Sequence, residues 1–354
     1  MGNYEQIENY LEKHPTVSGT RRTLDITRRG AYRNIFCIKI RTMRLDNDPD
    51  RWISPIKYLL HYSRIDLDKF TFQGSVDITV AVVSESTKTI RLHSIDLHVR
   101  SARVTNDHGE MVEASRLEVD APNESVYFYF DQDIADTSHV VVEFEGSLSD
   151  NLAGLYRSFY TNQSGEKRAM AVTQFEPTDA RRAFPCMDDP ALKAVFQVQV
   201  CTHADRLVIS NTQVISVSSD KEWKLWKFAA TPVMSTYLLA WVVGEFDKIV
   251  DYTDRGIETT VYTPLGRSEE GQFAMNVAKK ALSFFEKEYG VNYPLKKQDL
   301  LAIPDFAAGA MENWGMVTYR EARLLTHTTR SSTSQKLSVA RVVSHELAHQ
   351  WFGK

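Results

Sequence analysis

The segment His345-Glu346-Leu347-Ala348-His349 places two histidines four positions apart in the sequence. On an α-helix this spacing puts both imidazoles on one face, where they can bind a single Zn²⁺. Glu346 follows the first histidine and can then act as a general base on a zinc-bound water. The alternative interpretation is an amphipathic helix that carries two surface histidines without a metal.

The residues before this motif favour a helix. Residues 334–344 contain neither glycine nor proline, and the Ser/Thr cluster 331–334 supplies candidates for the helix N-cap. Val339, Val342, Val343 and Leu347 recur at spacings of three and four, which is typical of a helix with one buried face. The sequence therefore predicts one helix that leads into the two histidines.

A second motif, Gly309-Ala310-Met311-Glu312-Asn313, lies upstream of this helix. Taken alone it predicts a loop or an edge strand with an ordinary solvated glutamate. Together the two motifs resemble the gluzincin aminopeptidases of the M1 family. The similarity also includes residues 172–186, 231–238 and 313–321, covers roughly residues 53–353, and is closest to the puromycin-sensitive, cytosolic branch.

The resemblance implies a zinc site with one Zn²⁺ and substrates that are peptides with a free N-terminus. His345 and His349 correspond to the first two zinc ligands, and Glu346 to the general base. Glu312 corresponds to the glutamate that holds the substrate's α-amino group through a charge-assisted hydrogen bond. A substrate without that amine would leave this carboxylate unpaired, which disfavours endopeptidase activity.

The resemblance implies further substrate-binding residues. Glu176 corresponds to a second anchor for the amine, with a solvated loop residue as the alternative, and Gln174 to a neighbour of the first side-chain pocket. Backbone groups of Gly309 and Ala310 are expected to align the peptide as an added strand. Met311 and Asn313 complete this predicted substrate-binding motif.

The expected fold class is α+β, with a β-saddle N-terminal domain followed by the first part of a thermolysin-like catalytic domain. Residues 76–82, 126–130 and 196–200 alternate apolar and polar side chains, as strands do. Residues 259–262 and 300–303 predict strands, and residues 268–289 predict a helix that stops at Gly290. This helix is expected to bury Phe273, Val277, Ala281 and Phe284. The predicted domains are 51–247 and 248–354.

Residues 1–50 do not share the resemblance. Eight basic residues and one acid lie between Arg21 and Arg44. A targeting segment or a patch for nucleic acid or membrane is conceivable, and we favour a poorly ordered extension or an artefact of gene prediction.

Composition excludes some classes of function. The net charge is −4 and the pI near 6.2, so a general affinity for nucleic acid is not expected. No apolar stretch is long enough to span a membrane. The first residues, Met1 to Gln6, do not include the apolar core of a signal peptide. Three cysteines, Cys37, Cys186 and Cys201, are too sparse for a disulfide framework. The chain is therefore expected in the cytoplasm. We also expect Cys186 to be a buried residue, and Arg181 and Arg182 to form structural ion pairs.

The chain departs from the family pattern at its end. The family's third zinc ligand, a glutamate on the following helix, and its oxyanion-stabilising tyrosine have no counterpart before Lys354, where the family usually has asparagine. Since a catalytic zinc site needs three protein ligands, we expect a fragment that is inactive alone, produced by an unspliced or mispredicted gene. The alternatives are a catalytically inactive peptide-binding or regulatory product, and a scaffold whose basic N-terminal run recruits a partner.

Overall fold

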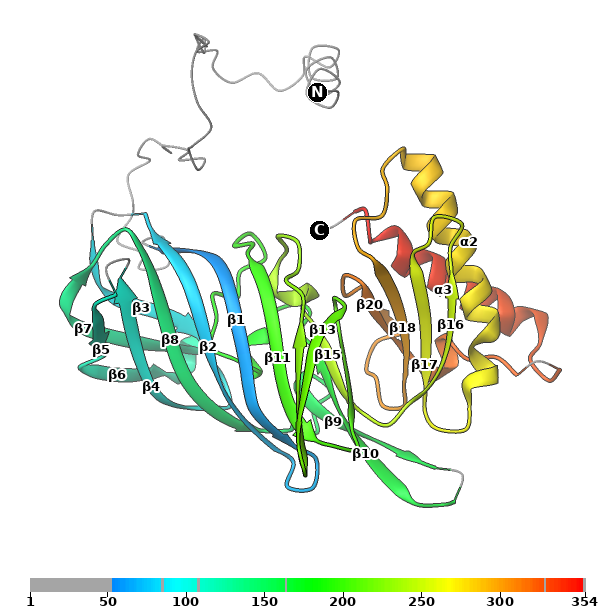
Figure 1. The fold of residues 1–354 in the computed structure, drawn as a ribbon, viewed down its shortest axis with the longest axis horizontal. Helices are drawn as coiled ribbons and strands as arrows, with labels where there is room; N and C mark the ends of the chain where they lie inside the picture. The colour runs from blue at the N-terminus through cyan, green and yellow to red at the C-terminus, as the bar shows by residue number, and fades with distance from the viewer. Residues whose placement is uncertain (1–52, 84–85, 107–108, 163, 328, 353–354) are drawn as a thin grey trace, which may run out of the picture. The chain divides into compact units, whose positions relative to one another are not determined.

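The computed structural model describes residues 53–83, 86–106, 109–162, 164–327 and 329–352. The predictions for residues 1–50, for Cys37 and for Lys354 lie outside these ranges. The described residues are mostly β-sheet with a few helices, which confirms the α+β class (Figure 1).

Three sheets make up the N-terminal part. The largest has the strand order β13 (Val214–Asp220), β14 (Trp223–Phe228), β11 (Val195–His203), β1 (Ile53–Asp66), β2 (Thr71–Val82), β8 (Thr137–Ser147), β4 (Leu97–Asn106) and β5 (Met111–Glu113). A smaller sheet contains β3 (Thr87–His93), β7 (Ser125–Ile134) and β6 (Arg116–Asp120). The third contains β12 (Leu207–Ser210), β15 (Trp241–Gly244), β10 (Lys167–Gln174) and β9 (Gly154–Thr161).

The alternation in the sequence predicts these strands correctly. In β2, Val76, Ile78 and Val80 are fully buried and the residues between them are half-buried. The alternating apolar residues of β7 and β11 are buried in the same way. One face of each strand therefore supplies the core, as period-two patterning requires.

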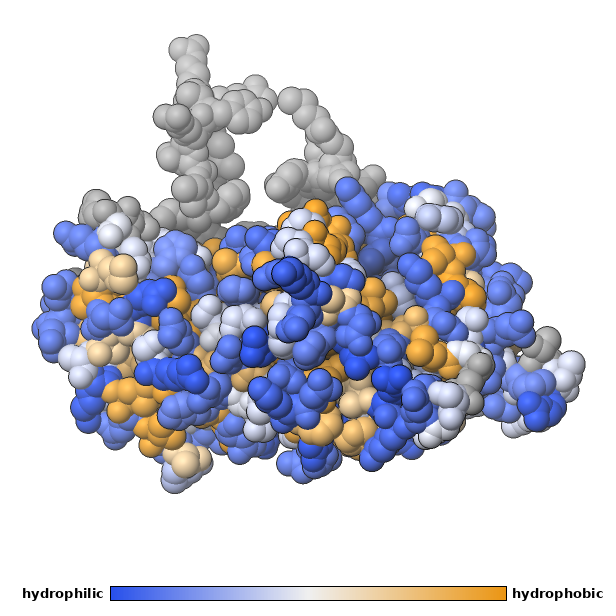
Figure 2. All heavy atoms as spheres, turned by 60° about the horizontal axis from the view of Figure 1, so that its bottom comes forward, coloured by the Kyte–Doolittle hydropathy of each residue, from blue (hydrophilic) through white to orange (hydrophobic). Residues whose placement is uncertain are grey.

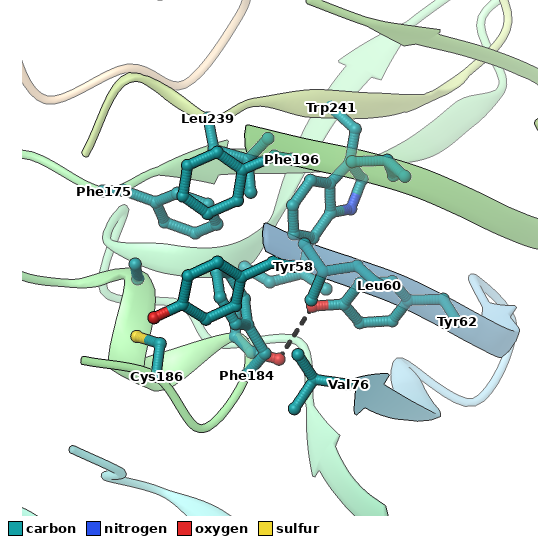
Figure 3. Packing of buried hydrophobic residues seen from close by; sticks show 14 of the residues in the cluster. Tyr58, Leu60, Tyr62, Val76, Phe175, Phe184, Cys186, Phe196, Leu239 and Trp241 are labelled. Atoms are coloured by element: carbon teal, nitrogen blue, oxygen red, sulfur yellow. Dashed lines mark hydrogen bonds between the residues drawn. The ribbon is translucent and has the colours of Figure 1, made fainter. Parts of the chain in front are cut away.

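Aromatic side chains fill the core between the largest sheet and the β9–β10 sheet. Tyr62 of β1 packs on Trp241 of β15 with ring centroids 4.9 Å apart, and Phe175 and Phe184 surround the same indole (Figure 3). The Tyr62 hydroxyl donates a hydrogen bond to the Ala183 carbonyl at 2.8 Å. This core fixes the end of β10, where Gln174 lies, and the following loop, which carries Glu176.

The C-terminal part is a five-stranded sheet with two helices. The strand order is β16 (Asp247–Tyr252), β17 (Glu258–Thr263), β18 (Lys297–Ile303), β20 (Met316–Arg320) and β19 (Ala310–Met311). Helices α2 (Gln272–Tyr289) and α3 (Thr333–Ala348) pack against each other beside this sheet (Figure 1). Short 3₁₀ helices complete the connections: η2 (Ala121–Asn123), η3 (Ala180–Arg182), η4 (Thr236–Leu238), η5 (Ser268–Gly271) and η6 (Glu321–Arg323).

Strand β18 is buried on both faces, as its continuous apolar run predicts. Leu300 and Ala302 belong to the core under the helices, whereas Leu301 and Ile303 belong to the core shared with the N-terminal sheets. This strand therefore joins the two parts of the chain. The strands on either side of the predicted boundary at residue 247 lie in different sheets, although the domain limits themselves remain predictions.

The prediction for α2 is wrong in two details. Residues 268–271 form a 3₁₀ turn, so the α-helix begins at Gln272. Phe284 is 57% exposed, because the face of α2 that packs inward is a different one, formed by Ala274, Met275, Ala278, Ala281 and Leu282. The stop at Gly290 is confirmed, since this glycine has a left-handed φ of 65°.

Three smaller predictions are confirmed. Cys186 is fully buried. Arg181 bonds to the buried carboxylate of Asp188 at 3.0 Å, and Arg182 to Asp179 at 2.7 Å. The Arg residues and the cysteine are therefore structural.

The surface in Figure 2 is mainly hydrophilic, with hydrophobic residues in small separate patches. Such scattered apolar residues are ordinary for a protein surface. Among the residues that the structure describes, no helix is both long and apolar enough to cross a membrane.

Candidate active site

The end of α3 brings the two predicted zinc ligands together. Ser332 caps the helix by accepting a hydrogen bond from the Gln335 backbone at 3.1 Å, and Val339, Val343 and Leu347 anchor its buried face. His345 and His349 then lie on the exposed side with their Nε2 atoms 3.2 Å apart.

This separation fits a single metal ion. Two nitrogens bound to zinc at about 2.05 Å each and separated by 3.2 Å subtend an angle of about 100° at the ion, close to a tetrahedral angle. The imidazole planes are nearly perpendicular, at 85°. The donor set and the separation of the two Nε2 atoms therefore suit Zn²⁺.

Glu346 lies between these histidines in sequence and is buried, whereas His345 is exposed and His349 is half-buried. Glu346 is 7% exposed, and its charge contributes to the environment of the buried Tyr319 hydroxyl. Burial first, and then Glu346, raises the pKa of Tyr319 well above its usual value. The Tyr319 hydroxyl has no hydrogen-bond partner among the described residues, so a polar group remains available beside the predicted base.

The described residues contain one other arrangement with metal-ligand spacing. It consists of Asp66, Asp68 and His203, and no third carboxylate or imidazole completes a comparable group with His345 and His349 in the described ranges. Asp66 Oδ1 already accepts hydrogen bonds from the backbones of Asp68 and Lys69 at 3.0 Å each. Asp66 therefore stabilises the turn that follows β1 with its own side chain.

The predicted peptide-aligning strand, β19, is the edge of its sheet. The Gly309 carbonyl accepts a hydrogen bond from the Arg320 backbone at 3.0 Å, and Ala310 pairs opposite Tyr319 of β20. Because backbone groups alternate in direction along an antiparallel strand, those of Ala310 point to the outer edge. The backbone groups available to an added peptide strand are therefore those of Ala310, since the Gly309 carbonyl is already bonded to β20.

The rest of this motif is turned inward. Met311 is fully buried, and Asn313 is 1% exposed with its amide donating to Thr318 Oγ1 at 3.2 Å. Their side chains lie in the core and fix the conformation around Glu312. The predicted substrate contacts of Met311 and Asn313 are thus restricted to their backbones.

The loop after β10 reaches this edge. Phe175 is fully buried against Trp241, and Glu176 next to it is exposed. Gln174 is half-buried, and its Oε1 is a buried acceptor without a hydrogen-bond partner in the described ranges. An unsatisfied buried acceptor is costly unless a ligand or water supplies a donor, which suits a residue of a binding pocket.

Two carboxylates meet here. Loss of solvation, followed by the charge of Glu312, raises the pKa of Glu176, and His349 partly offsets this. Loss of solvation followed by the charges of Glu312 and Glu176 also raises the pKa of Tyr237. The structure therefore brings Glu176, Glu312 and His349 into one electrostatic neighbourhood, with Tyr237 beside them.

The N-terminal sheets hold the loop before β19 in place. Asp305 Oδ2 accepts hydrogen bonds from the Phe159 backbone at 2.8 Å and from Ser158 Oγ at 3.1 Å. The Tyr156 hydroxyl donates to the Asp305 carbonyl at 2.9 Å. The position of the edge strand therefore depends on β9 of another sheet.

Sequence reasoning missed the residues that join these parts. Gln350 is 1% exposed and bonds to the backbones of Glu312, Gly315 and Glu346. Asn211 donates to the Trp314 carbonyl at 2.9 Å. The only signal for Gln350 was its place next to His349, and no local pattern identifies Asn211, because its partner is 103 residues away.

Comparison with known proteins gives two family matches. Residues 54–238 match the peptidase M1 N-terminal domain, and residues 273–354 match the peptidase family M1 domain.

Several curated proteins are similar over most of this chain. Aminopeptidase M1 of Arabidopsis thaliana is 43% identical over 292 residues, which cover 81% of this chain and 33% of that protein. Endoplasmic reticulum aminopeptidase 1 of Mus musculus is 39% identical over 309 residues, 85% of this chain and 33% of that protein. Aminopeptidase 2, mitochondrial, of Saccharomyces cerevisiae is 39% identical over 318 residues, 87% of this chain and 33% of that protein. The chain thus spans about a third of the length of the curated relatives it matches.

Proposed function

Because the chain belongs to peptidase family M1, we propose that it provides the N-terminal domain and the first part of the catalytic domain of a zinc-dependent aminopeptidase. This enzyme releases N-terminal residues from peptides. A closer kinship with the puromycin-sensitive branch stays a prediction, since the relatives compared include plant, endoplasmic reticulum and mitochondrial aminopeptidases.

One observation carries the proposal: the Nε2 atoms of His345 and His349 converge to 3.2 Å at the end of α3. A bound Zn²⁺ would supply a water of lowered pKa and polarise the scissile carbonyl. His345 and His349 would hold the ion, and Glu346 would accept the proton of the attacking water. The low exposure of Glu346 limits competing contacts with bulk water.

The carboxylates of Glu176 and Glu312 support specificity for an amino terminus. Loss of solvation, and then repulsion by the charge of Glu312, raises the pKa of Glu176. A substrate ammonium between them would relieve this repulsion and pair with both. An acetylated terminus would not, so peptides need a free α-amine.

Alignment of the peptide follows from the edge strand. The backbone of Ala310 is directed outward and can add the substrate as a further strand. The first peptide bond then lies between the amine anchors and the histidines. Gln174, whose Oε1 lacks a partner among the described residues, would contact the first side chain.

Turnover by this chain alone is not expected. Catalytic zinc sites use three protein ligands and a water, whereas two histidines converge among the described residues. We therefore propose that this chain binds Zn²⁺ and amino-terminal peptides, and that turnover needs a third ligand from outside the described ranges.

A chimera tests the function directly. Residues 53–352 replace the matched third of Aminopeptidase M1 of Arabidopsis thaliana, and release of the first residue from a short peptide is measured by mass spectrometry. We expect release from the free peptide and none from its N-acetylated form. Glu346→Gln should lower kcat by several orders of magnitude, while Arg341→Gln, on the exposed side of the same helix, serves as a control.

The chimera must be shown to fold and bind zinc for the result to count. A folded, zinc-loaded chimera that releases no residue would refute the aminopeptidase assignment. Cleavage of the acetylated peptide would instead identify an endopeptidase.

The second candidate function is zinc-independent peptide binding, which the pair of converging ligands without a third in the described ranges favours. It predicts that the chain binds free-amine peptides equally well with and without a chelator, and that Glu312→Ala abolishes this binding. Loss of binding on removal of zinc would exclude it. A cytoplasmic location remains a prediction.

A further inference from the structure

We propose that Gln350 is a positioning residue that sets the spacing between the amine anchor Glu312 and the general base Glu346. The inference rests on the proposed function and deepens it. It concerns how the site measures one residue from the amino terminus.

The Gln350 side chain bridges the two functional glutamates through their backbones. Its Nε2 donates to the Glu312 carbonyl at 3.3 Å and to the Glu346 carbonyl at 3.2 Å. Its Oε1 accepts from the Gly315 backbone at 3.1 Å. One amide group thereby ties the end of the zinc helix to both sides of the Glu312 loop.

The geometry of the helix end explains why a side chain performs this task. A regular helix would pair the Glu346 carbonyl with the backbone N–H of residue 350. Here that N–H donates to the Leu347 carbonyl at 3.1 Å, because the last turn tightens. The side chain of Gln350 caps the remaining Glu346 carbonyl, and its second N–H can then reach Glu312.

The Glu312 loop, residues 312–315, also forms hydrogen bonds with residues other than Gln350. Asn211 donates to the Trp314 carbonyl at 2.9 Å, and buried Lys297 donates to the Gly315 carbonyl at 3.1 Å. Asn211 follows β12, and Lys297 also donates to the Ser210 carbonyl of β12 at 2.8 Å, so the Glu312 loop is held against an N-terminal sheet. Gln350 therefore connects the end of α3 to a loop whose position is fixed by other hydrogen bonds.

The separation matters because an aminopeptidase must place the amine and the first carbonyl at the same time. Consecutive residues of an extended peptide advance by about 3.3–3.6 Å. Displacements of about 1 Å can cost 100-fold in rate. Hydrogen bonds from Gln350 to the carbonyls of both Glu312 and Glu346 suit this requirement. A residue that only filled the core would need neither of these hydrogen bonds.

The test uses the complete 354-residue chain with Zn²⁺ and three forms of one short peptide. One form has a normal α-amine, one begins with β-alanine, and one is N-acetylated. The β-alanine form carries its amine about 1.5 Å farther from the first carbonyl. Fluorescence anisotropy gives the dissociation constant of each form.

Wild type should prefer the α-amine over the β-amine by about 10-fold, the usual scale for one methylene. Gln350→Met keeps the shape without the hydrogen bonds and should reduce this preference toward one, with zinc affinity unchanged. Gln335→Met, at an exposed position in the first turn of the same helix, should leave it intact. If Gln350→Met does not fold, Gln350→Asn, which keeps the amide but is too short to span both carbonyls, takes its place.

The outcomes separate the two proposals. If wild type binds the α-amine and acetylated forms equally, the proposed function fails and this inference fails with it. If wild type distinguishes them but the Gln350 variant weakens the α- and β-amine forms by the same factor, Gln350 is only structural and the inference alone is overturned. Faster hydrogen exchange at the Gly315 amide in the variant should accompany a supporting result.

Discussion

The turn after Glu312 depends on a glycine that admits no side chain. Gly315 has a φ of +78°, and a Cβ at this position would lie 2.4 Å from the Asn211 carbonyl oxygen and 2.6 Å from Leu295 Cδ1. Since one of these atoms belongs to the backbone directly after β12, it cannot move aside cheaply. We predict that Gly315→Ala destabilises the chain and displaces the Glu312 loop.

Gly256 provides a matched control. Its φ is +79°, but nothing lies within 4 Å of its added Cβ. Both substitutions cost about 1–2 kcal/mol for a left-handed alanine and gain the same reduction in unfolded-state entropy. Only Gly315→Ala adds overpacking, which typically costs about 1–3 kcal/mol.

Equilibrium urea unfolding of both variants measures the difference. We expect Gly315→Ala to lose about 1–3 kcal/mol more than Gly256→Ala, the overpacking cost alone, and to bind the free-amine peptide more weakly. Equal losses for the two variants, within about 0.5 kcal/mol, would refute the close packing of this turn on the N-terminal sheet.

Four further predictions concern three residues. His345→Ala should lower zinc affinity by more than about 100-fold in competition with a chelator, because losses in the outer shell alone cost 10–100-fold. Glu176→Gln should raise the urea midpoint at pH 7, because it removes a charge that is disfavoured first by loss of solvation and then by repulsion from Glu312, and it should weaken free-amine peptide binding. Because the pKa of Glu176 is raised in the folded state, the stability that this group contributes should fall as pH rises from its ordinary pKa to the raised one. Peptide binding should rise over the same pH interval, and a titration by anisotropy checks this. Asp188→Asn should cost about 3–5 kcal/mol, because it breaks a buried ion pair. Asp150→Asn, in an exposed pair, should change the free energy of unfolding far less, because solvent screens the two charges.

Local sequence patterns predict much of the fold. The helix that carries His345 and His349 is evident from its periodicity and its Ser/Thr cap, and the apolar run of β18 from its length. These features depend on neighbours within a few residues. The error at Phe284 has the opposite origin. Tertiary packing selects the buried face of α2, which carries alanines together with Met275 and Leu282, and the spacing of Phe273, Val277 and Phe284 in the sequence predicts a different face.

The arrangement of the candidate site required the structure. Sequence spacing brings His345 and His349 together, but it does not place Glu176 near Glu312, 136 positions later. That neighbourhood arises because Phe175 is anchored under Trp241 while β9 holds the loop before β19. Gln350 likewise acquires its partners only when the helix end meets the Glu312 loop.

The zinc ion itself offers the most direct test of the central claim. Crystals of the chain grown with Zn²⁺ should show, in anomalous diffraction at the zinc absorption edge, one strong peak about 2.0–2.1 Å from the Nε2 atoms of both His345 and His349. A peak between Asp66, Asp68 and His203 alone, or no ordered peak at the end of α3, would contradict the account.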